Sequence, residues 1–188
     1  MTSPNEILQY WETFPKKFID QLKEKIGEEK FVKLTDILVR YEVFKEDAFK
    51  DVNNFTEETA CEFSEDKTQT QGWLNLSHYL GSLGSSLGQT DRDEYIPDAL
   101  EVLELAIIIF PENPVARMTY ALLCYCFSDL QEKAKVEAKK TVELLEKIPS
   151  LVPDNIKEEM VGKMDIILKD EEFGEVPGEE GEENTESE

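Results

Sequence analysis

Cysteine and histidine are scarce in this sequence of 188 residues, which contains three cysteines and one histidine. An odd number of cysteines argues against a disulfide framework, and a thiol-poor chain suits a reducing compartment. Cys124 and Cys126 lie two residues apart, so on a helix their side chains diverge and cannot pair with each other. A single histidine cannot supply a pair of metal ligands. We therefore expect neither a disulfide nor a bound metal.

Long hydrophobic runs are also missing. No window holds the uninterrupted apolar stretch that a membrane span needs, and residues 1–6 lack the basic start of a signal peptide. The glycine-rich run 81–88 lacks the Gly-Lys-Ser/Thr ending of a phosphate-binding loop. We therefore expect a cytoplasmic protein that binds no membrane and no nucleotide cofactor.

Basic residues are few, with 20 lysines and arginines against 42 aspartates and glutamates. Residues 170–188 contain ten of the acidic residues and no basic one, so residues 1–169 carry 32 acidic and 20 basic side chains. Such a surface repels phosphate backbones, which argues against nucleic acid as a partner. It suits another protein whose binding segment is basic or apolar.

Apolar residues recur at helical spacing along most of the chain, so the sequence predicts an all-α protein. A capping box that begins at Ser3 starts an N-terminal helical region over residues 1–52. Residues 53–72 are polar and lack periodicity, which predicts a linker. Residues 73–169 form the main helical domain and end in a capping helix. Residues 170–188 are expected to be an acidic, disordered tail.

A helical hairpin is the clearest pattern in the main domain. The apolar run 99–110 is stopped by the sequence Pro-Glu-Asn-Pro at 111–114, and a second apolar run follows at 115–127. Proline ends one helix and favours the first turn of the next. Two helices are therefore predicted to fold back on each other.

The segment 73–149 resembles tetratricopeptide repeats. The matching residues are Trp73, Leu80, Gly84, Ala99, Leu103, Ala106 and Pro111 in the first unit, and Tyr120, Ala121, Cys124, Ala134 and Ala138 in the second. Arg117 departs from the pattern, because a large apolar residue is usual there. The resemblance implies antiparallel helix pairs stacked in a short array, whose first helices line a groove that binds protein.

By this register the groove is lined by Leu74, His78 and Ser82 in the first unit. In the second unit it is lined by Met118, Leu122 and Tyr125. Residues spaced three or four apart lie on one helical stripe. The alternative for the three apolar residues of the second unit is a place in the core, since apolar stripes usually face inward.

The expected function is a non-catalytic adaptor or chaperone that holds a segment of another protein. In size, charge and layout the chain is similar to type III secretion chaperones for translocator proteins. Trp11, Phe14 and Phe18 then form a homodimer contact, or else they pack onto the repeats. Two alternatives stay open: a structural subunit of a complex, and an enzymatic or small-ligand site around His78 and Tyr79.

Overall fold

The computed structural model describes residues 11–12, 16–41, 69–90, 92–148 and 152–170, and this part of the chain is helical, with no strand. The α-helices are α2 (Lys16–Ile26), α3 (Glu28–Arg40), α6 (Gln69–Gly88), α7 (Ile96–Ile109), α8 (Pro114–Tyr125), α9 (Gln131–Lys147) and α10 (Asp154–Lys169). Short 3₁₀ turns, Asp93–Tyr95 and Ser128–Leu130, precede α7 and α9. The predicted all-α class is confirmed.

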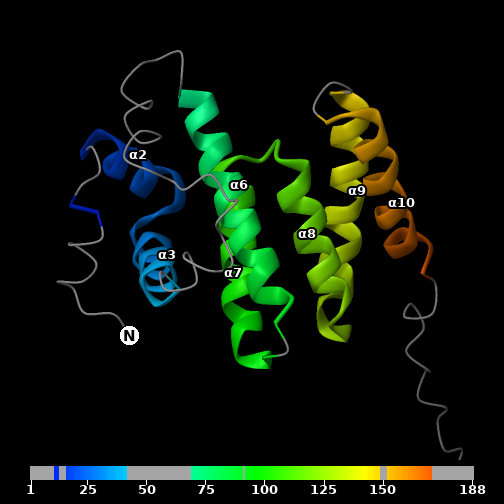
Figure 1. Ribbon diagram of the computed structural model, residues 1–188, viewed down its shortest axis with the longest axis horizontal. Helices are drawn as coiled ribbons and strands as arrows, with labels where there is room; N and C mark the ends of the chain where they lie inside the picture. The colour runs from blue at the N-terminus through cyan, green and yellow to red at the C-terminus, as the bar shows by residue number, and fades with distance from the viewer. Residues whose placement is uncertain (1–10, 13–15, 42–68, 91, 149–151, 171–188) are drawn as a thin grey trace, which may run out of the picture.

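The helices from α6 to α10 stand side by side (Figure 1). From α7 onward each helix packs along the one that precedes it, and short connections join them, so consecutive helices of this group run antiparallel. In addition, α6 contacts α8 and α8 contacts α10. These three helices form one layer, while α7 and α9 form the second.

Glycines bring α6 close to its neighbours. A Cβ atom on Gly84 would lie 2.5 Å from Leu103 Cγ of α7, and one on Gly81 would lie 3.7 Å from Ala116 Cβ of α8. One turn beyond Gly84, Gly88 faces Leu123 of α8. Gly81 and Ala116 are 35 residues apart, as are Gly88 and Leu123, so α6 and α8 run in the same direction.

The hairpin predicted around residue 111 is confirmed. Asn113 caps α8, because its side-chain oxygen accepts hydrogen bonds from the backbone N–H groups of Val115 (3.1 Å) and Ala116 (3.2 Å). Its amide nitrogen donates to Ser77 Oγ of α6 at 2.9 Å, and Ser77 in turn donates to the carbonyl oxygen of Ala106 in α7 at 2.7 Å. This buried network ties three helices together at one end.

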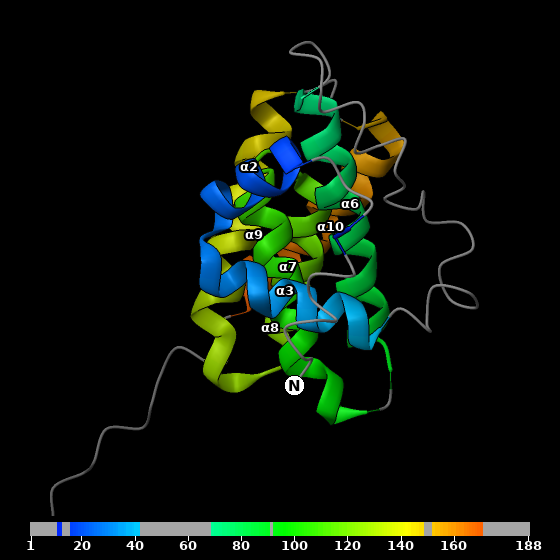
Figure 2. The same cartoon turned by 90° about the vertical axis from the view of Figure 1, so that its left-hand side faces the viewer.

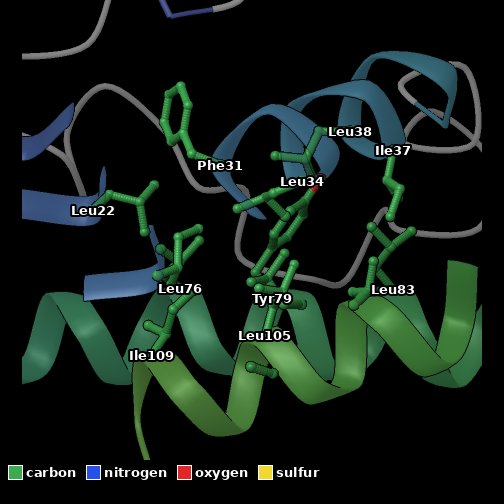
Figure 3. Packing of buried hydrophobic residues seen from close by; sticks show 14 of the residues in the cluster. Leu22, Phe31, Leu34, Ile37, Leu38, Leu76, Tyr79, Leu83, Leu105 and Ile109 are labelled. Atoms are coloured by element: carbon green, nitrogen blue, oxygen red, sulfur yellow. The ribbon is translucent and has the colours of Figure 1, made fainter. Parts of the chain in front are cut away.

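The first hydrophobic core joins the N-terminal helices to α6 and α7. Figure 3 shows Leu22 and Leu34 facing Leu76 of α6 and Leu105 of α7. A second core lies between α7, α8, α9 and α10, and it is built from Leu103, Tyr120, Ala121, Cys124, Ala134, Ala138, Met164 and Ile167. Ile107 packs against both cores, so the two are continuous.

The N-terminal helices lie in front of α7 in Figure 2, and both contact it. Gly27, whose φ of 84° suits glycine, separates α2 from α3. Trp11 and Phe18 are buried in the first core of this chain, in agreement with the alternative that these aromatic residues pack onto the helices of their own chain. Trp11 Nε1 donates a hydrogen bond to Thr35 Oγ1 at 2.8 Å. The homodimer stays a prediction.

Several sequence predictions fall outside the described residues. These are the capping box at 3–6, the aromatic residue Phe14, the last part of the N-terminal helical region at 42–52, most of the linker and the tail from 171 onward. Within the described part, α6 begins at Gln69, so the last four residues of the predicted linker are helical.

Candidate functional site

A groove with a volume of about 240 Å³ lies between the parallel helices α6 and α8. Both helices and the turn before α8 line it. Its described lining residues are His78, Gly81, Ser82, Ser85, Ser86, Asn113, Val115, Ala116 and Thr119. The layer formed by α6 and α8 therefore carries a hollow with mostly small, polar walls.

Helical periodicity explains the walls of this groove. On α6, His78, Ser82, Ser85 and Ser86 follow one another at spacings that return to the same face. On α8, residues 115 and 119 are one turn apart and face them. The floor is the close contact between Gly81 and α8, where small side chains keep the two helices near each other.

The hydroxyl groups of the groove retain capacity for hydrogen bonding. Within the described residues, the hydroxyls of Ser82 and Ser86 have no partner. Thr119 Oγ1 donates to the carbonyl oxygen of Val115 at 2.9 Å and can still accept. Ser85 Oγ accepts from Gln89 Nε2 at 3.1 Å and can still donate. The groove therefore offers both donors and acceptors.

His78 stands at the exposed rim of the groove. Partial desolvation by the surrounding helices lowers the pKa of its imidazole below the usual range, which favours the neutral form near pH 7. No carboxylate, ammonium, guanidinium or thiol is among the described lining residues. Tyr79 is buried on another face of α6, in the first core, so it does not line this groove with His78.

The structure separates the six residues predicted to line a groove. His78 and Ser82 line the one described here, whereas Leu74 lies on α6 outside it and is half-buried. The apolar residues of α8 are half-buried and pack against the second core; they are Met118, Leu122 and Tyr125. The hydroxyl of Tyr125 also donates to the carboxylate of Asp170 at the end of α10.

Sequence reasoning missed most of the groove lining. Ser85 and Ser86 could have been found by extending the stripe from His78 and Ser82 by one more turn. Val115 and Thr119 carry no such signal, because α8 has several stripes and only its packing partners decide which stripe meets α6.

Arg117 lies on another side of α8, where it forms a partly buried ion pair with Glu137 of α9. Its Nε atom donates to the carbonyl oxygen of Pro111 at 2.8 Å. A second cavity of about 370 Å³ lies nearby and is lined by residues of α7, α8 and α9. Its described lining residues are Glu104, Tyr120, Glu132, Lys133, Val136 and Glu137.

Neither a metal centre nor a membrane span is found in the part of the chain that the structure describes. There, no three His, Cys, Asp or Glu side chains gather closely enough to hold a metal ion. None of the described helices combines the length and apolar character needed to cross a membrane. The chain matches no model of a known protein family, and no curated protein or solved structure was found to be similar to it.

Proposed function

We propose that this chain is a non-catalytic protein-binding module, an adaptor or chaperone that holds a segment of another protein between α6 and α8. The observation that carries the proposal is the groove itself, in which the hydroxyl groups of Ser82 and Ser86 on α6 are not used by the described part of the chain. Two parallel helices with open hydrogen-bonding groups between them suit a segment laid along both.

The helix arrangement supports the repeat-like part of this proposal. The displacement of 35 residues between facing positions of α6 and α8 is close to the ~34-residue period of tetratricopeptide repeats. In such arrays the helices that correspond to α6 and α8 line the binding surface. We extend that role to this chain as part of the proposal.

Selection of peptides from a random displayed library by the full chain tests the proposal. Ser82→Trp fills the groove, and Lys139→Trp places the same side chain on the exposed surface of α9. We expect the selected peptides to bind the wild type and Lys139→Trp equally. Binding to Ser82→Trp should fall at least about tenfold, at an unchanged melting temperature.

Two results contradict this function. The first is that selection on this protein enriches no peptide beyond those enriched by selection on an unrelated helical protein. The other is equal binding to Ser82→Trp and to the wild type, which places the binding surface elsewhere on the molecule.

A further inference from the structure

We infer that the segment held between α6 and α8 is an extended, uncharged stretch of small hydrogen-bonding residues, of the serine, threonine, asparagine and glycine type. This inference rests on the proposed function and names the class of its partner. It differs from the apolar or basic segment expected from the sequence, because the apolar residues of α8 lie outside the described lining of the groove.

Charge is the first argument. The described lining contains no ionised side chain, since His78 is held toward its neutral form. A lysine or glutamate of the partner that entered the groove would lose hydration and gain no counter-charge. A carboxylate would in addition meet the field of a chain whose formal net charge is −22. An uncharged segment avoids both penalties.

Hydrogen bonding is the second argument. Ser82, Ser86 and Thr119 present hydroxyls along the two walls. A large apolar side chain would strip water from these groups and leave them without a replacement. An extended backbone carries unpaired N–H and C=O groups that need partners, and hydroxyls can serve as either donor or acceptor.

The shape of the groove is the third argument. Gly81 and Ala116 form its floor, so a chain can approach the helix surfaces closely there. The stripe from His78 to Ser86 extends about 12 Å along α6 at the rise of an α-helix. That length matches about four residues of an extended segment. A short stretch with small side chains fits these dimensions.

Fluorescence anisotropy with the full chain tests the partner class. Four labelled peptides of equal length are compared, which differ only in their central residues. The first has a mixture of serine, asparagine and glycine there, and the other three have leucine, lysine and glutamate, respectively. We expect the uncharged polar peptide to bind tightest. Thr119→Val keeps the side-chain shape, and the pair Ser82→Ala and Ser86→Ala removes two hydroxyls. Each hydroxyl removed should weaken that peptide about threefold to tenfold.

Ser128→Ala removes a hydroxyl from the turn before α9 and should leave binding unchanged. Circular dichroism of each variant shows that the fold is kept. Tighter binding of the leucine or lysine peptide, with no effect of the groove hydroxyls, overturns the inferred class but leaves a protein-binding groove in place. If no peptide of any class binds, both the class and the proposed function fail.

Discussion

Gly84 lies at a close approach of α6 to α7. A Cβ atom there would lie 2.5 Å from Leu103 Cγ and 3.1 Å from the carbonyl oxygen of Ala99. Because the second obstacle is backbone, Gly84→Ala must push the helices apart, and we expect a loss of about 1–3 kcal/mol in the free energy of unfolding. Urea denaturation followed by circular dichroism measures it.

Gly162 is the matched control, because an added Cβ would meet nothing within 4 Å on the exposed face of α10. Alanine is the better helix former, so Gly162→Ala should raise the free energy of unfolding by up to about 1 kcal/mol. Equal effects of the two substitutions would show that the close approach at residue 84 carries no special cost.

The ion pair between Arg117 and Glu137 is the second residue-scale feature with a measurable consequence. Both side chains are only 12% exposed. Arg117→Met leaves the largely buried carboxylate of Glu137 with only the half-exposed Lys140 as its counter-charge, at 2.7 Å, and should cost about 1–3 kcal/mol. Combining it with Glu137→Leu removes the carboxylate that has lost its main partner and should recover part of that loss. Thermal and urea denaturation of the single and double variants check this, and a strictly additive double variant would contradict it.

At the scale of elements, α3 is joined to α7 by a row of ion pairs. The row comprises Lys30 with Glu104 at 3.2 Å, Lys33 with Glu101 at 2.5 Å and Arg40 with Asp98 at 2.6 Å. The cationic partners are between 37% and 56% exposed. Water therefore screens these pairs, and the apolar core beneath them contributes more to the attachment of α3.

Substitutions at two neighbouring residues of α3 distinguish the contribution of the ion pairs from that of the apolar core. Lys33→Ala removes an exposed ion pair and should lower the free energy of unfolding by less than about 1 kcal/mol. Leu34→Ala empties a fully buried site in the first core and should cost about 2–5 kcal/mol. Chemical denaturation at low and at 1 M salt compares them. A larger effect for Lys33→Ala, or one that salt does not reduce, would contradict the assignment.

The elements themselves were largely predictable. The apolar periodicity of α2, α3, α7, α8, α9 and α10 identified them as helices, and the residues at 111–114 marked the hairpin. The start of α6 was not predictable in the same way. Its first turn is polar, so apolar periodicity does not mark the helix there, although Thr68 and Gln71 have the spacing of a capping box.

At the scale of the whole molecule, α7 is the most enclosed element. It packs against α2, α3, α6 and α8, whereas among the described helices α10 packs mainly against α9 and α8. Local opening is hardest where most neighbours must move together. We therefore expect the backbone amides of α7 to exchange most slowly with deuterium and those of α10 much faster.

Native-state hydrogen exchange with mass spectrometry measures this difference. Peptides that cover 100–109 should be protected longest, and peptides that cover 156–168 should exchange at least about tenfold faster. Equal protection across the stack would mean that all described helices open only through global unfolding. Such a result would contradict the predicted gradient.

The candidate site was only partly within reach of sequence reasoning. His78 and Ser82 were assigned to a groove, and both line the one between α6 and α8. The apolar stripe of α8 was correctly seen as one face of a helix, but α8 lies between α6 and α10. Periodicity cannot say which neighbour a half-buried stripe will meet, and here it packs toward the second core.

The sequence by itself determined the all-α class, the positions of most helices and the hairpin before Asn113. These follow from local chemistry, since helical periodicity and proline act within a few residues of the chain. Only the tertiary structure decided that α6 and α8 run parallel, that the N-terminal helices share a core with α7, and that serine and threonine hydroxyls lie along the walls of the groove. Those outcomes depend on contacts between residues far apart in the chain. The apolar face of a helix must be buried, but its sequence does not specify which other helix will cover it.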